Sequence, residues 1–168
     1  MERMSPLLDG MAIVVVTVSD RSAAGQRPDT TGPVLAEALR DAGAEVVGTV
    51  VPDDVGEVTR ALEAAIASGA RAVVTTGGTG IGPRDVTPEA TAPLIVRQLP
   101  GIPELLRQRD AGENPLVALS RGVAGVTARP APAIVINLPG SATAVASAID
   151  VLPTLIAHAV AQLDGGDH

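Results

Sequence analysis

Hydrophobic and polar residues alternate along the chain in blocks that favour strands and helices in turn. Runs rich in β-branched residues cover residues 12–18, 45–51, 71–75 and 133–137. The first, third and fourth runs are almost continuously apolar, which is typical of strands that are covered on both faces of a sheet. We therefore predict that these four strands form the centre of the fold.

The segments between the strands carry apolar residues at helical spacing. Residues 32–42 begin with a proline in the first turn and are followed by Gly43, as expected for a helix and its C-terminal cap. Residues 54–68 begin with Asp54 and Glu57, whose spacing resembles a capping box and makes Asp54 a candidate N-cap. Four more helices are predicted over residues 87–98, 103–109, 141–150 and 151–162.

This alternation predicts an α/β fold with three layers, α/β/α, in which helices cover both faces of a doubly wound and mostly parallel central sheet. Residues 123–129 are a further candidate strand, joined to residues 133–137 through Pro130-Ala131-Pro132. A connection this short requires an antiparallel pair, so the sheet is expected to be mixed.

The length of 168 residues suits one domain with a single core. We see no internal repeat and no linker. We expect a single domain over residues 11–163, with flexible ends at residues 1–10 and 164–168.

Composition narrows the functions that are possible. The chain has no Cys and no aromatic residue, and all 12 of its basic residues are Arg. It therefore has no thiol nucleophile, no Walker A lysine and no aromatic platform for single-stranded nucleic acid. The formal net charge of −7 argues against a nucleic-acid partner. No uncharged apolar stretch reaches roughly 18 residues, so we expect no membrane partner and a cytoplasmic location.

Small, polar and acidic residues follow each predicted parallel strand, at the edge where open α/β sheets bind ligands. The segment after the third strand stands out, because residues 77–82 contain four glycines that let backbone amides approach an anion. Arg84 and Asp85 follow, and Thr87 is expected to cap the next helix. We predict a phosphate site, with a purely structural turn as the alternative. Arg84 is better placed than Arg21 or Arg121 to clamp a phosphate.

Two aspartates have no evident structural task. Asp53 is free if Asp54 caps the following helix, and Asp85 is free if Thr87 caps the other one. Two spare carboxylates at one sheet edge suggest Mg²⁺, which prefers one or two carboxylates together with waters and substrate phosphates. The alternative is that both aspartates are solvated surface residues.

The sequence around these residues resembles the MogA/MoaB family of molybdenum cofactor biosynthesis proteins, the molybdopterin adenylyltransferases. The glycine loop reads TTGGTGIGPRDVTPEAT at residues 75–91. Four further segments resemble family segments and occur in the family's order: VSDRSAAGQRPDTTGP, VVPDD, ALSRGVAGV and INLPGSATAV. The resemblance extends over residues 13–163.

The resemblance implies that AMP is transferred from Mg-ATP to the terminal phosphate of molybdopterin, with release of pyrophosphate. It places the family's two important aspartates at Asp53 and Asp85, as catalytic residues and Mg²⁺ ligands. The substrate-binding residues that it implies are Ser19, Asp20, Asp29, Thr76, Gly77, Gly78, Thr79, Gly80, Arg84, Ser120, Pro139, Gly140 and Ser141.

Relatives of this type assemble as homotrimers or hexamers, and a molybdate-insertion protein uses their product. The resemblance therefore implies a homotrimer, or a hexamer, and a partner of that kind for this chain. The alternative function is that of a non-catalytic molybdopterin-binding or scaffolding paralogue in the same pathway.

Overall fold

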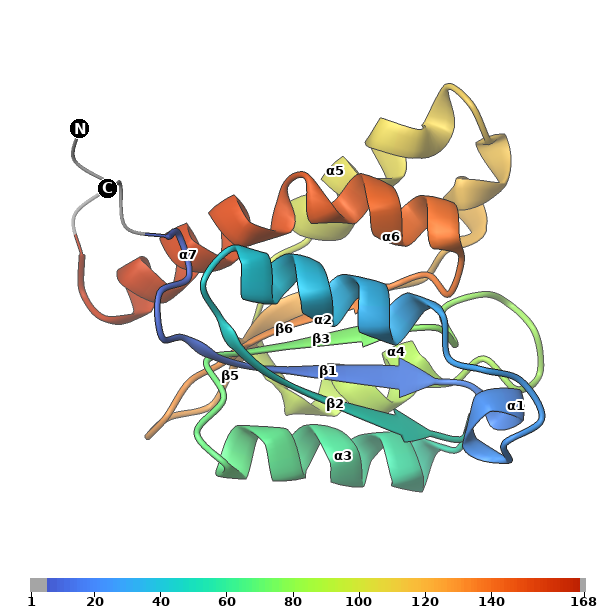
Figure 1. Cartoon of the computed structure of the whole chain (residues 1–168), viewed down its shortest axis with the longest axis horizontal. Helices are drawn as coiled ribbons and strands as arrows, with labels where there is room; N and C mark the ends of the chain where they lie inside the picture. Colours follow the sequence, from blue (N-terminus) through green and yellow to red (C-terminus); the bar gives the residue numbers. More distant parts are fainter. Residues whose placement is uncertain (1–5, 167–168) are drawn as a thin grey trace.

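Six strands form one mixed sheet in the computed structural model, which describes residues 6–166 (Figure 1). The strands are β1 (Ala12–Val18), β2 (Glu45–Val51), β3 (Ala72–Thr76), β4 (Ile95–Gln98), β5 (Ala124–Thr127) and β6 (Ile134–Leu138). Their order in the sheet is β2-β1-β3-β6-β5-β4. The strands β2, β1, β3 and β6 are parallel, whereas β5 is antiparallel to both β6 and β4. The mostly parallel, mixed sheet is thus confirmed.

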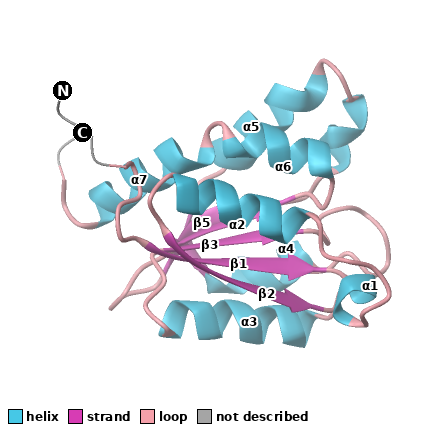
Figure 2. Cartoon of the chain, in the orientation of Figure 1, coloured by secondary structure: helices cyan, strands magenta, loops and turns pink. Residues whose placement is uncertain are grey.

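Helices cover both faces of the sheet, which gives the predicted three layers (Figure 2). The helices are α1 (Asp20–Ala23), α2 (Thr31–Asp41), α3 (Val55–Ala67), α4 (Thr87–Thr91), α5 (Gly101–Ala111), α6 (Ala142–Ile149) and α7 (Leu152–Leu163), with 3-10 turns η1 (Ala92–Leu94) and η2 (Pro115–Leu119). The helices α2, α5, α6 and α7 pack on one face, and α3 and α4 pack on the other.

No single helix within residues 6–166 has the length and hydropathy needed to cross a membrane. The helices α6 and α7, which meet at 56°, pass that test as a bent pair.

The core follows the alternation of side chains along the central strands. In β3, Ala72 and Val74 belong to the cluster that α2 and α6 cover, and Val73 belongs to the cluster under α3. Every residue of β3 and β6 is buried. The continuous apolar runs in the sequence arise because both faces of these strands lie against helices.

The predicted helix over residues 87–98 is wrong in its second half. The α-helix ends at Thr91, and Ile95–Gln98 form β4, which pairs with β5. Pro93 has no N–H to continue the helical hydrogen bonds, so the chain leaves the helix through η1. Four residues are too few for periodicity to identify a strand.

The segment before β1 is packed, although we expected residues 1–10 to form a flexible end. Leu8 is fully buried, and its backbone N–H donates to Ala42 O at 2.9 Å. At the other end, Asp164 accepts a hydrogen bond from Arg71 at 2.7 Å. Contacts with the fold thus reach beyond residues 11–163 on both sides, and residues 1–5, 167 and 168 lie outside the described part of the chain.

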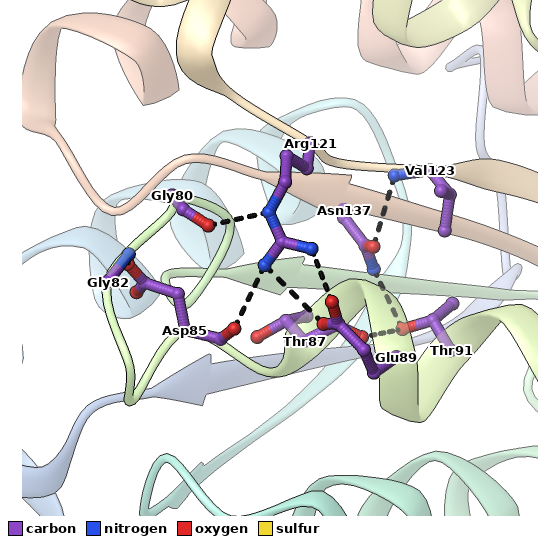
Figure 3. Close-up of polar contacts among 9 residues, drawn as sticks. All are labelled: Gly80, Gly82, Asp85, Thr87, Glu89, Thr91, Arg121, Val123 and Asn137. Atoms are coloured by element: carbon purple, nitrogen blue, oxygen red, sulfur yellow. Dashed lines mark hydrogen bonds and ion pairs between the residues drawn. The ribbon is translucent and has the colours of Figure 1, made fainter.

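A buried asparagine joins the centre of the sheet to its second half. Asn137 on β6 donates to Thr75 Oγ1 at 3.0 Å. It also donates to Thr91 Oγ1 at 3.1 Å, and its Oδ1 accepts from the backbone N–H of Val123 at 3.2 Å (Figure 3). These bonds connect β3, β6, α4 and the chain entering β5. A satisfied polar group inside an apolar core fixes one arrangement of its neighbours.

The loop after β3 passes directly beneath the end of β1. Gly77 has a φ of +102°, and a Cβ at this position would collide with the carbonyl oxygen of Val18. Its N–H donates to Leu138 O at 3.0 Å, so the ends of β1, β3 and β6 meet at this residue. Glycine is therefore required here for two reasons, its backbone angle and the lack of space.

We predict that Asn137→Ala lowers the free energy of unfolding by about 2–4 kcal/mol, because the Val123 N–H loses its acceptor and a cavity is left. The measurement is urea unfolding followed by circular dichroism. The control is Val47→Ala, because the Val47 side chain is 66% exposed and its loss should change stability by less than about 0.5 kcal/mol. Equal midpoints for the two variants would contradict the prediction.

We also predict that Gly77→Ala destabilises the fold more than Gly69→Ala does. Gly69 has a φ of +90° and open space around it, so its substitution costs only the left-handed backbone, about 1–2 kcal/mol. Gly77→Ala adds the collision with Val18 and should cost more than about 3 kcal/mol in total. The same unfolding measurement compares them, and similar losses would show that the close approach at Gly77 is unimportant.

Candidate active site

Loops beyond β1, β2, β3 and β6 enclose a cleft of about 320 Å³ at the carboxyl ends of these parallel strands. We call it the first cleft. Most of the predicted site residues line it, namely Ser19, Asp29, Asp53, Thr76, Gly77, Gly78, Asp85 and Gly140. The fold thus brings together segments that are far apart in the sequence.

A second cleft, of about 410 Å³, opens on the side of the glycine loop that faces η2. Five further predicted residues line it: Thr79, Gly80, Ser120, Pro139 and Ser141. Three residues line both clefts: Gly78, Asp85 and Gly140. These three form a shared boundary, so two ligands bound side by side would meet there.

Asp53 lies just beyond the end of β2 and is held by Asp20. Its Oδ2 accepts from the backbone N–H of Asp20 at 2.8 Å, and its own N–H donates to Asp20 Oδ1 at 3.0 Å. Burial raises the pKa of the Asp53 carboxyl above its ordinary value, and the charges of Asp20 and Asp85 act in the same direction. Asp53 and Asp85 are thus close enough to repel each other.

Asp85 lies against the glycine loop that precedes it. Its Oδ2 accepts from the backbone N–H of Gly82 at 2.9 Å. A Cβ on Gly80 would lie 2.8 Å from this oxygen, and a Cβ on Gly78 would lie 3.1 Å from Asp53 Oδ1. The glycines therefore let both carboxylates approach the loop backbone closely.

The two aspartates suit a cation with few protein ligands. Each has one carboxylate oxygen, Oδ1, that makes no hydrogen bond within residues 6–166. No group of three or more His, Cys, Asp or Glu residues in this part of the chain is arranged to hold a metal ion. Two carboxylates with one open oxygen each fit Mg²⁺ that completes its shell with waters and phosphate oxygens better than they fit a cage of protein ligands.

Arg84 and Asp20 form an ion pair beside the first cleft and line neither cleft. The Arg84 guanidinium donates to both carboxylate oxygens of Asp20, at 2.9 and 3.0 Å. These hydrogen bonds hold the pKa of Asp20 below its ordinary value. Both side chains are well exposed, so the pair adds little to stability. Arg84 is thus paired with Asp20, and its phosphate contact stays a prediction.

Several residues predicted to bind substrate already have structural partners. The hydroxyl of Thr76 is buried and donates to Pro139 O at 3.0 Å. Asp29 accepts from Thr17 Oγ1 at 2.7 Å and from Gly32 N–H at 3.0 Å. The hydroxyls of Ser19 and Ser141 cap the helices α1 and α6. Roles of these side chains in binding also stay predictions.

Capping matches the prediction at one of the two helices considered. Asp54 caps α3 and accepts from Glu57 N–H at 2.9 Å, as predicted. The prediction is wrong at Thr87, because this residue lies inside α4 and Val86 takes the cap position. The Thr87 hydroxyl instead donates to Gly77 O at 2.8 Å and fixes the start of the glycine loop. Asp85 is left free to line the cleft because Val86, and not Thr87, takes the cap position of α4.

The sequence offered Arg121 only as a weaker candidate than Arg84 for clamping a phosphate, and it did not reveal that Arg121 contacts the glycine loop. Its guanidinium donates to Gly80 O and to Asp85 O, and it forms an ion pair with Glu89 (Figure 3). The hydrogen bond from Arg121 to Glu89 lowers the pKa of the Glu89 carboxyl below its ordinary value. Its neighbour Ser120 lines the second cleft. The Ser-Arg segment was a motif of the resemblance, but its sequence carries no sign of which atoms Arg121 reaches.

Comparison with known proteins finds a family that covers most of the chain. A family model described as a probable molybdopterin binding domain matches residues 14–158. The chain is 40% identical, over 146 residues that cover 86% of each chain, to a molybdopterin adenylyltransferase of Pyrococcus furiosus. It is 43% identical, over 162 residues, to a molybdenum cofactor biosynthesis bifunctional protein of Synechococcus elongatus. That alignment covers 96% of the chain and spans half the length of the bifunctional protein.

Solved structures give the same result. The tungsten cofactor synthesizing protein MoaB from Pyrococcus furiosus superposes with a TM-score of 0.86 and 38% identity, covering 91% of this chain and 96% of that one. A molybdopterin biosynthesis protein from Mycobacterium abscessus superposes with a TM-score of 0.85 and 41% identity, covering 92% and 97%. From the domain match, these likenesses and the order of the site loops, we conclude that the chain belongs to the MogA/MoaB family of molybdenum cofactor biosynthesis proteins.

Proposed function

We propose that this protein is a molybdopterin adenylyltransferase, a nucleotidyltransferase of molybdenum cofactor biosynthesis. In the proposed reaction, an oxygen of the terminal phosphate of molybdopterin attacks the α-phosphorus of Mg-ATP. A new P–O bond forms as the bond to the bridging α–β oxygen breaks, and pyrophosphate leaves with that oxygen. The products are adenylylated molybdopterin and pyrophosphate.

One observation carries the proposal: Asp53 and Asp85 lie against the same glycine loop, where Asp85 lines both of two adjoining clefts and Asp53 lines the first. Two phosphorylated substrates need adjoining sites, with the reacting groups at the boundary. The attacking oxygen belongs to a substrate, so the reaction needs no nucleophilic side chain, which suits a chain without Cys or Lys. Transfer between phosphates depends mainly on positioning and on stabilisation of charge.

The roles of the residues follow from where they lie. Asp53 and Asp85 would hold Mg²⁺ through their open Oδ1 atoms, and the ion, when bound, neutralises phosphate charge. The backbone of Gly77 to Gly80 would approach the phosphates without obstruction from side chains. In this proposal Asp20 orients Asp53 through their reciprocal hydrogen bonds, so its effect on activity is indirect.

The direct test is incubation with Mg-ATP and molybdopterin, followed by measurement of adenylylated product and pyrophosphate. Product formation supports the transferase. Tight binding of molybdopterin without product would instead support the scaffolding alternative. Three further properties that the resemblance implies remain proposals: the homotrimer, the molybdate-insertion partner and the cytoplasmic location. Light scattering measures whether the protein is a homotrimer.

We predict that Asp53→Asn and Asp85→Asn each reduce AMP transfer at least about 100-fold while the fold is kept, because the charge that holds the cation is lost. The measurement is the initial rate of pyrophosphate release at saturating substrates. Asp54→Asn is the matched control, since Asn keeps the N-cap of α3 and residue 54 does not line the first cleft. A wild-type rate in either test variant would remove that residue from the reaction.

The substitution Asp53→Asn, which should lower the activity, should keep or raise the thermal stability. Burial raises the pKa of Asp53 in the folded state. The contribution of Asp53 to stability is therefore most favourable in acid, where the carboxyl is protonated. This contribution is lost as the pH rises through the raised pKa and the carboxyl ionises. Without Mg²⁺, Asp53→Asn should therefore equal or exceed wild type in Tm at pH 7, with the difference shrinking as the pH falls toward 4. The measurement is thermal unfolding in EDTA across this range, and a lower Tm for the variant at pH 7 would contradict the sign.

A further inference from the structure

The tip of the glycine loop is exposed, and its side-chain attachment to the rest of the fold is the ion pair of Arg84 with Asp20. Residues 81–84 are exposed, whereas Gly77 and Thr79 before them and Thr87 after them are buried. Within the loop, Asp85 N–H donates to Gly82 O, and Gly82 N–H donates to Asp85 Oδ2. These two bonds lie within the loop, so they fix its shape and do not attach it to the rest of the fold.

Arg121 joins the two sides of this exposed tip. Its Nε donates to Gly80 O at 2.8 Å, just before the tip, and its Nη2 donates to Asp85 O at 2.9 Å, just after it. Its backbone N–H also donates to Thr79 O at 2.8 Å. Figure 3 shows the guanidinium between Gly80 and Asp85, with the Glu89 carboxylate on its remaining side. One planar group thus holds both ends of the tip.

Glu89 completes this arrangement from the helix that follows the loop. Its carboxylate forms an ion pair with Arg121 Nη1 and extends from α4. Arg121 is therefore fixed between the loop and α4. Three donors of a rigid guanidinium face three separate acceptors, and a lysine ammonium has no matching geometry.

We propose that Arg121 is a positioning residue, held by Glu89, that sets the place of the Asp85 carboxylate at the boundary of the two clefts. This inference rests on the proposed transferase function. Arg121 lines neither cleft, so it acts through the backbone of residues 80 and 85 and does not touch substrate. It therefore affects the rate at which bound substrates react more than it affects their binding.

The test compares Arg121→Lys with Arg71→Lys, a matched control. Arg71 pairs with Asp164 just before β3, at the end of this strand that lies away from the glycine loop. The side chains of Arg71 and Asp164 are 34% and 58% exposed. Those of Arg121 and Glu89 are 36% and 50% exposed. Both substitutions keep the positive charge and should shift Tm by no more than about 4 °C.

Arg121→Lys should lower kcat about 10- to 100-fold, as expected when a reacting group is displaced by about 1 Å, and should raise the Mg²⁺ concentration for half-maximal rate. The KM for ATP should stay within about 3-fold, and Arg71→Lys should match wild type throughout. Three outcomes would each overturn the proposal: an unchanged kcat, a raised KM for ATP with unchanged kcat, or an equal loss of kcat in the Arg71 control.

Glu89→Gln serves as the second variant, because it keeps Arg121 and removes only the charge that holds it. We expect a smaller loss of kcat in the same direction. The double variant should lose less than the product of the two single effects, since both act through the same hydrogen bonds. A fully multiplicative loss, or a wild-type kcat for Glu89→Gln, would show that the two residues do not act together.

An NMR measurement that does not depend on enzymatic activity tests this proposal separately from the proposed function. The Gly82 amide reports the position of the Asp85 carboxylate, to which it donates. In NMR spectra of the substrate-free protein, its resonance should move in Arg121→Lys and stay in place in Arg71→Lys. If wild type transfers no AMP, the transferase function fails and the Gly82 resonance still decides whether Arg121 positions Asp85. A resonance unmoved in Arg121→Lys would overturn the positioning role.

Discussion

The close approach of three strand ends at Gly77 is the constraint on which the site depends. The residue lies beneath the Val18 carbonyl, bonds to Leu138, and its Cα would lie 3.1 Å from a Cβ on Gly140. No side chain fits between these backbones. Because the ends of β1, β3 and β6 are this close, the loops that follow them share one cleft edge. Asp85 lies on the loop after β3, and Asp53, which follows β2 beside β1, reaches the same loop backbone.

Negative charge is concentrated at this edge of the sheet. The protein carries a formal charge of −7, and Asp20, Asp53 and Asp85 lie near one another. Arg84 neutralises Asp20, whereas burial and neighbouring charges raise the pKa of Asp53. A carboxylate kept in an unfavourable setting is typical of sites where stability has been sacrificed for function. Under the proposed function, an anionic nucleotide would therefore bind at this edge better with its cation than without it.

The sequence predicted those parts of the molecule that depend on local pattern. The strands β3 and β6 were evident from continuous apolar runs, and Asp53 stood out because Asp54 had a capping task of its own. By contrast, β4 is four residues long and follows Pro93 within an apparently helical pattern, so only its pairing with β5 identifies it. Arg121 reaches Gly80 and Asp85 across 41 and 36 residues of sequence. A contact of that kind depends on the path of the chain through the whole sheet.

The segments that carry the chain into and out of the fold lie away from the clefts. Leu8 is bonded to Ala42, just before β2 begins, and Asp164 is paired with Arg71, just before β3 begins. Both anchors lie at the amino ends of the parallel strands, and the clefts lie beyond the carboxyl ends. The strand arrows in Figure 1 point toward the carboxyl ends. A second module joined at either end would therefore leave access to the clefts free. The chain aligns with half the length of a bifunctional protein of Synechococcus elongatus, a length that leaves room for a second module there.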